Sequence, residues 1–121
     1  MEINIPGIDA EKALDLYDDD FDIFLMVLRS YAANTPMVLD RLRSVSAETL
    51  ADYAANVHGV KGTSANIGAE ELRKAALKQE GLAKAGDLSS VLSNNNTFLS
   101  DADTLLKNIN KWLEEYDSED K

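Results

Sequence analysis

The chain contains no cysteine, one histidine and two prolines among its 121 residues. Without cysteine it can form no disulfide, thiolate metal site or cysteine nucleophile, and a cytoplasmic location is favoured. A lone histidine without a Glu-x-x-His pair argues against a metal site in a helical bundle. A glycine-rich phosphate loop is also missing, so an autonomous enzyme is not expected.

Long apolar runs and excess positive charge are missing as well. No apolar stretch approaches the roughly 18 residues of a membrane span, and the N-terminus lacks the pattern of a signal peptide. The net charge of −10 argues against nucleic acid and membrane as partners. This charge is uneven, because residues 58–84 carry five basic and three acidic side chains and sum to +2. Ordinary surface lysines are the plain alternative to a functional basic strip.

Helical periodicity dominates the sequence, and no strand-like alternation is found. The expected helix N-caps are Asp9, Asp19 or Asp20, Thr35 ahead of Pro36, Ser46, and Asp87. The helix that Ser46 begins should run to about Asn66, with Gly68 as its stop, and residues 69–85 should form another helix that ends at Gly86. The last helix should be the longest, about 43 Å. Its polar run at residues 94–96 predicts either a local kink or no effect on the helix.

Short connections between long helices predict an all-α fold, an antiparallel up-down four-helix bundle with a short N-terminal helix or helices covering one end. We expect residues 1–121 to form a single domain. Its ordered core should cover about residues 5–116, and residues 117–121 should be a frayed tail.

His58 lies on the helix expected to end near Asn66. At 100° per residue, the apolar residues of this helix occupy one arc, and His58 points about 130° away from the centre of that arc. The pattern therefore disfavours a buried core histidine. A solvated surface histidine remains an alternative.

The residues around His58 are unusually small. A solvated helix face normally carries long polar side chains, whereas alanine and glycine let another protein's backbone approach. Gly62 costs the helix about 1 kcal/mol relative to alanine, and neutral drift is the alternative explanation for it. We predict a partner-binding surface made of Ala51, Ala54, Ala55, Gly62, Ala65 and Lys84.

A neutral imidazole is a nucleophile near pH 7. His58 can accept a phosphoryl group on Nε2 if an acceptor holds its Nδ1–H and fixes the tautomer. Lys61, one turn away, can reach the phosphoryl oxygens as a point charge. Glu80 is the candidate acceptor on the next helix, with Gln79 as its rival. A solvated helix acid is the plain alternative for Glu80.

The segment of residues 58–69, His-Gly-Val-Lys-Gly-Thr-Ser-Ala-Asn-Ile-Gly-Ala, resembles the signature of histidine-containing phosphotransfer (HPt) domains. That signature is His, two variable residues, Lys-Gly, small residues, an apolar residue and Gly-Ala. The opening Ile-Pro-Gly-Ile-Asp-Ala-Glu-Lys-Ala-Leu of residues 5–14 also looks like the first helix of this family. The resemblance extends from about residue 5 to residue 116.

The resemblance implies that His58 is the phosphoacceptor, that Lys61 steadies the phosphoryl group and that Gly62 leaves room for a docking receiver domain. It also implies a carboxylate or amide near Glu80 bonded to the histidine ring. Many members read Leu-Glu where this chain has Gln79-Glu80, and Gly81 follows here.

An HPt domain carries phosphoryl groups in a multistep phosphorelay and has no autonomous catalytic activity. Its partners are the receiver domains of response regulators or hybrid sensor kinases. The receiver supplies the phosphorylated aspartate and the Mg²⁺, so no cofactor is expected to bind this chain. A non-catalytic helical adaptor that binds a partner through the small-residue face is the alternative function.

Overall fold

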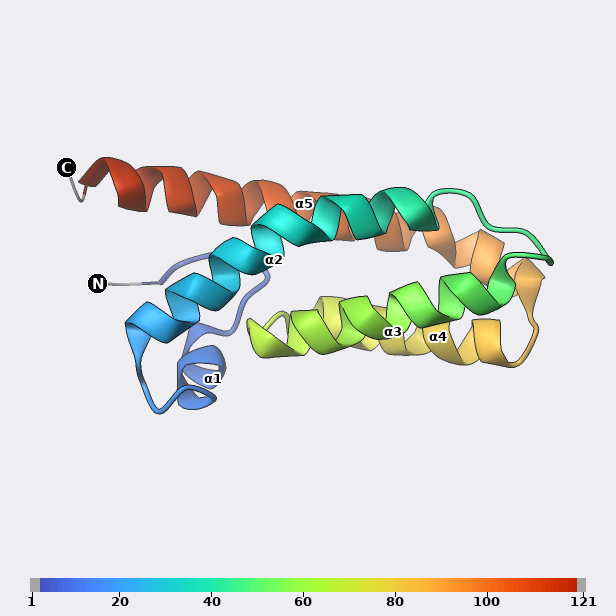
Figure 1. The fold of residues 1–121 in the computed structure, drawn as a ribbon, viewed down its shortest axis with the longest axis horizontal. Helices are drawn as coiled ribbons and strands as arrows, with labels where there is room; N and C mark the ends of the chain where they lie inside the picture. The colour runs from blue at the N-terminus through green and yellow to red at the C-terminus, as the bar shows by residue number, and fades with distance from the viewer. Residues whose placement is uncertain (1–2, 120–121) are drawn as a thin grey trace.

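The computed structural model describes residues 3–119, which contain five α-helices and no strand (Figure 1). These helices are α1 (Ala10–Asp15), α2 (Phe21–Leu42), α3 (Leu50–Asn66), α4 (Glu70–Lys84) and α5 (Leu88–Glu119). The expected all-α fold is therefore confirmed. Within residues 3–119, none of the helices has the length and apolarity needed to span a membrane.

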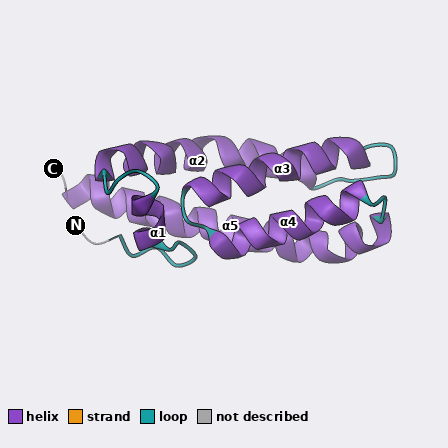
Figure 2. Ribbon diagram, turned by 90° about the horizontal axis from the view of Figure 1, so that it is seen from below, coloured by secondary structure: helices purple, strands orange, loops and turns teal. Residues whose placement is uncertain are grey.

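The four long helices surround one apolar core. α2 and α4 each pack against both α3 and α5, so the contacts form a closed ring, and Figure 2 shows the same helices lying along one another. Each helix contributes buried side chains at three- and four-residue spacing, as an amphipathic helix requires. They include Phe24, Leu28, Leu39, Val57, Val60, Ala76, Val91 and Ile109.

The helix ends agree with the sequence at several points. The side chain of Asp9 accepts from the Lys12 backbone N–H at 3.1 Å. Asp20 rather than Asp19 caps α2, because its carboxylate accepts from the Ile23 N–H at 3.2 Å. Asp87 accepts from the Ser90 N–H at 3.1 Å at the start of α5. These caps satisfy backbone donors that the first turn of a helix leaves unpaired.

The turn after α3 fixes the position of the N-terminal segment. Gly68 adopts φ +75°, and a Cβ there would lie 2.5 Å from the carbonyl oxygen of Asp9, so only glycine fits. The Asp9 N–H donates to the Gly68 carbonyl at 2.9 Å. Tyr17 donates to the carbonyl of Asn66 at 2.7 Å. α1 is thereby attached to the end of α3 (Figure 1).

The predicted helix start at Thr35-Pro36 is wrong. Pro36 lies inside the continuous helix α2, although proline in a helix interior costs about 3 kcal/mol. Tyr31, Thr35, Leu39 and Leu42 are all buried on the same side of α2. Because this buried stripe continues through the proline, tertiary packing outweighs the local cost.

The predicted N-cap at Ser46 is also wrong, since α3 begins at Leu50 with Thr49 as its cap residue. The Ser46 N–H donates to the Thr49 hydroxyl at 2.9 Å, and the Thr49 N–H donates to the Ser46 carbonyl at 3.2 Å. Hydroxyl side chains favour such local turns as readily as helix caps. Ser46 therefore closes a turn ahead of the helix.

α5 continues to Glu119, so residues 117–119 of the predicted frayed tail are helical, while 120 and 121 lie outside the described residues. Arg29 of α2 donates to both carboxylate oxygens of Asp117, at 3.1 and 2.6 Å. Phe21, Trp112 and Tyr116 cluster nearby, with Trp112 and Tyr116 stacked at 5.4 Å. These contacts between α2 and α5 favour helix in this last segment.

The polar run at residues 94–96 does not interrupt α5, and its middle residue, Asn95, belongs to the core. Asn95 is buried, accepts from the Tyr53 hydroxyl at 2.7 Å and donates to the Leu42 carbonyl at 2.9 Å. Gln79 donates to the Tyr53 hydroxyl at 2.8 Å and to the Val91 carbonyl at 3.2 Å. This buried polar network links α2, α3, α4 and α5. It also satisfies the carbonyl that the end of α2 leaves unpaired.

Candidate functional site

His58 projects from the middle of α3 toward solvent. The opposite side of the helix is buried and fixes its rotation. The buried residues on that side are Tyr53, Val57, Val60 and Ser64. The His58 side chain is 64% exposed. The outward direction taken from the helical periodicity is thus confirmed.

Glu80 reaches His58 from α4. Its side chain is only 4% exposed, and its Oε2 lies 2.6 Å from Nδ1 of His58. Its Oε1 accepts from Nζ of Lys61 at 2.7 Å. The structure therefore brings His58, Lys61 and Glu80 together, and Glu80 is not a solvated helix acid.

Glu80 remains ionised despite its burial. The hydrogen bond from Lys61, followed by those from Lys84 and His58, lowers the pKa of Glu80 to about 2, against the opposing effect of burial. An ionised carboxylate can only accept hydrogen bonds. Its contact with Nδ1 therefore assigns the proton to Nδ1 and leaves the lone pair on Nε2, which is the nitrogen free to act as a nucleophile.

Lys84 is a second cation on Glu80. Its Nζ lies 3.1 Å from Oε2, the oxygen that also accepts from His58. Lys84 was expected to contact a partner, and its side chain is 65% exposed. It therefore combines an ion pair inside the site with access to solvent.

Gln79, the rival candidate for holding Nδ1–H of His58, does not bond to the ring. It is buried, and its amide nitrogen donates to the Tyr53 hydroxyl and to the Val91 carbonyl in the core. Because neighbouring residues on a helix point about 100° apart, Gln79 enters the core when Glu80 faces His58. Glu80 is therefore the partner of the His58 ring, and the rival prediction of Gln79 is wrong.

The small-residue face is present, with one correction. Ala51, Ala55 and Gly62 are exposed and Ala65 is half-buried. Ala54 is buried instead, because α4 packs against this side of α3. Ala54 still lines a hollow of about 600 Å³ beside His58. The other described residues that line this hollow are Leu50, Ala51, Ala55, His58, Glu80, Ala83, Lys84 and Gly86.

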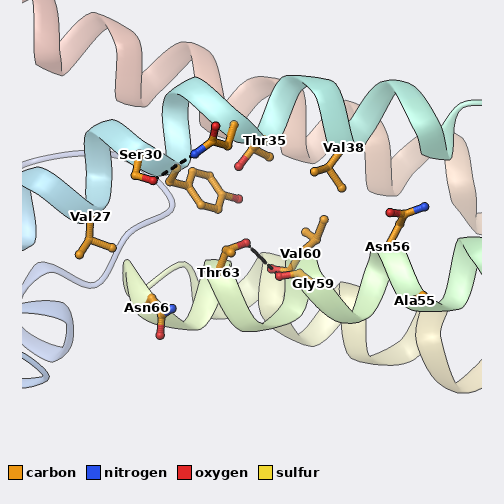
Figure 3. A pocket seen from close by; sticks show the side chains of 12 residues that line it. Val27, Ser30, Thr35, Val38, Ala55, Asn56, Gly59, Val60, Thr63 and Asn66 are labelled. Carbon is orange, nitrogen blue, oxygen red and sulfur yellow. Dashed lines mark hydrogen bonds between the residues drawn. The ribbon is translucent and has the colours of Figure 1, made fainter.

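A second hollow, of about 300 Å³, lies between α2 and α3 (Figure 3). The predicted partner-binding surface lies on α3 and α4 and does not include these residues of α2. None of the described lining residues is charged, although 28% of the chain is. Gly59 and Ala55 line it from α3, and Val27 and Val38 line it from α2. Ala55 also lines the hollow beside His58, so the two hollows adjoin along α3.

Most of the basic side chains of residues 58–84 form ion pairs within the molecule. Lys61 and Lys84 pair with Glu80, Arg73 with Glu70 at 2.9 Å, and Lys74 with Glu71 at 3.5 Å. These pairs leave the net charge of +2 unchanged: one positive charge belongs to Lys61, Lys84 and Glu80 together, and the other to Lys78.

No set of three or more His, Cys, Asp or Glu side chains within the described residues is arranged to hold a metal ion. Comparisons of the chain with protein-family models, curated proteins and solved structures gave no match. The chemistry of the site is therefore inferred from its residues and their geometry.

Proposed function

We propose that this protein is a histidine phosphotransfer module that carries a phosphoryl group on Nε2 of His58. The observation that carries the proposal is the hydrogen bond between the buried Glu80 carboxylate and Nδ1 of His58. This bond directs the free lone pair of an exposed imidazole toward solvent. The resemblance of residues 58–69 to the HPt signature independently supports the same residue as the phosphoacceptor.

The proposed step is balanced at His58. The lone pair of Nε2 attacks the phosphorus of an aspartyl phosphate, the N–P bond forms, and the P–O bond to the aspartate breaks. The aspartate carboxylate leaves with the electron pair. The ring gains positive charge and keeps its proton on Nδ1, where the Glu80 carboxylate stabilises it. The reverse reaction returns the group to another aspartate.

We propose receiver domains of response regulators or hybrid sensor kinases as the partners. The exposed residues Ala51, Ala55 and Gly62 present no long side chain around His58, which supports a close approach by a receiver. The receiver would bring its aspartate and Mg²⁺. This chain then supplies the nucleophile, its orientation and local positive charge, without autonomous catalytic activity.

We further propose that α2–α5 form an antiparallel up-down four-helix bundle, with α1 covering one end. The ring of contacts among α2, α3, α4 and α5 supports this arrangement, as do the short connections between them. In such a bundle His58 lies midway along one helix, away from both sets of turns. A receiver can then approach without meeting a loop.

The decisive experiment measures transfer of phosphoryl label to His58→Gln and to the wild type. The donors are phosphoramidate and a panel of receiver domains phosphorylated with acetyl phosphate. We expect the wild type to gain acid-labile, base-stable label, and the variant to gain none while keeping its helical circular dichroism. Wild-type protein that binds receivers but takes no label from any donor would instead establish the non-catalytic adaptor. Label on the variant would exclude His58 as the acceptor.

A further inference from the structure

The hollow beside His58 is open on one side and has a floor of small residues. Ala51, Ala54 and Ala83 line it together with His58 and Glu80. At about 600 Å³ it has ample room for a phosphoryl group attached to the ring. The cation that lines this hollow is Lys84, whereas Lys61 is not among its described lining residues.

The two lysines on Glu80 differ in their freedom to move. The Lys61 side chain is 26% exposed, and its Nζ donates to Oε1 of Glu80 at 2.7 Å. Lys84 is 65% exposed and makes a longer contact of 3.1 Å to Oε2. Oε2 also accepts from His58, so it keeps a donor when Lys84 leaves. Lys84 is therefore the cation that can depart at lower cost.

We propose that Lys84, released from Glu80, binds the phosphoryl oxygens in this hollow, while Lys61 stays on Glu80 as a positioning residue. This inference rests on the proposed phosphotransfer function. It departs from the role that the family resemblance gives to Lys61. The ion pair between Lys84 and Glu80 then belongs to the unphosphorylated form only.

The charges in the site favour this exchange. Glu80, Lys61 and Lys84 together carry +1 when His58 is neutral. A phosphoryl group adds about −2 at pH 7, so it offers Lys84 a stronger electrostatic partner than one carboxylate shared among three donors. Because Lys61 and His58 remain on Glu80, the carboxylate stays paired within the protein and the ring keeps its tautomer.

The test uses the full chain phosphorylated with phosphoramidate and then freed of donor. We expect Lys84→Ala to shorten the half-life of phosphohistidine about fivefold, the effect of one partly exposed charge contact. Lys84→Arg should restore most of the lifetime, and Lys61→Ala should shorten it less than Lys84→Ala does. Lys78→Ala is the matched control on α4, because Lys78 lines a different groove, and it should have no effect.

A spectroscopic readout separates contact from a general structural effect. In ¹H–¹⁵N spectra of the lysine ammonium groups, phosphorylation should shift the Lys84 signal and leave the Lys61 signal close to its original position. A shift of Lys61 alone, or a Lys84→Ala lifetime equal to the wild type, would overturn the inference while leaving the proposed function intact. A wild-type chain that no donor phosphorylates would contradict both this inference and the proposed function.

Discussion

The carboxylate of Glu80 joins three nitrogen atoms, from His58, Lys61 and Lys84, between α3 and α4. A buried carboxylate with this many donors stays ionised, and its ionisation fixes the tautomer of the imidazole. At the scale of single residues, the tautomer of the exposed histidine is thus set by a residue hidden from solvent.

Glu80→Gln tests this charge through the pH dependence of stability. Because the pKa of Glu80 is lowered to about 2 in the folded protein, against about 4.3 in an unfolded chain, the charge stabilises the fold fully above about pH 5. This contribution is lost as the pH falls toward 2. At pH 7 the variant should be less stable by on the order of 1–2 kcal/mol. The difference should shrink on acidification, as measured by urea unfolding.

Glu71→Gln is the matched control, since Glu71 lies on the same helix with its side chain 88% exposed. It should leave both the stability and its pH dependence nearly unchanged. A deficit of Glu80→Gln that is equally large at neutral and at acid pH would show that packing, and not charge, explains the effect.

The sequence alone predicts the direction of His58 but does not decide between Glu80 and Gln79 as its partner. The direction of His58 follows from the apolar pattern of α3 alone, because that helix has a clear buried side. The choice between Glu80 and Gln79 depends on the rotation of α4 against α3. That rotation is set by the contacts of Gln79 with Tyr53 and Val91, which the local sequence does not contain.

At the scale of the helix, Gly62 lowers the stability of α3 one turn from His58. Gly62 is exposed, and no described atom beyond its own helix lies within 4 Å of a Cβ built there. Any side chain would therefore fit, and most would favour the helix more than glycine does. The proposed docking of a receiver would account for the bare backbone at Gly62.

Gly62→Gln should raise the free energy of unfolding by up to about 1 kcal/mol. It should also slow phosphoryl transfer from a receiver, because the new side chain stands one turn from His58. Phosphoramidate needs no docking surface and should still phosphorylate the variant. Thermal melts and transfer assays on the same sample check the two effects together.

Gly81→Gln is the control, since Gly81 is an exposed mid-helix glycine of α4 with equally open space around it among the described atoms. It should stabilise the protein without slowing transfer. A Gly62 variant that is stabilised and still takes phosphoryl groups from a receiver at the wild-type rate would show that this face is not a docking surface.

The helix boundaries show where local signals are sufficient. Caps at Asp9 and Asp87 were predictable because their side chains act on the backbone three residues away. The signals at Thr35-Pro36 and Ser46 were misleading. In α2 the buried stripe overrides the proline, and before α3 the Ser46 and Thr49 hydroxyls bond to the turn instead.

At the scale of the whole molecule, Tyr53, Gln79 and Asn95 fix how the helices meet. Their hydrogen bonds join all four long helices inside the apolar core. Burial raises the pKa of the Tyr53 phenol, so it stays a neutral donor. Since Gln79 and Glu80 are adjacent, the network that holds Gln79 in the core also turns Glu80 toward His58.

Asn95→Ala should cost about 2–4 kcal/mol, because it opens a cavity, removes the acceptor of the Tyr53 hydroxyl proton and removes the donor to the Leu42 carbonyl. Asn96→Ala, at the exposed neighbouring position, should change stability by less than about 0.5 kcal/mol. Urea unfolding of both variants provides the comparison. Equal losses would mean that Asn95 is not a structural link between the helices.

The most direct test of the account is the position of the phosphoryl group on the ring. The chain has a single histidine, so ¹⁵N labelling of histidine gives unambiguous signals. After reaction with phosphoramidate, we predict coupling of ³¹P to Nε2 of His58 and a proton retained on Nδ1. Coupling to Nδ1, or the absence of coupling to either ring nitrogen, would contradict the claim that Glu80 prepares Nε2 of His58 to carry the phosphoryl group.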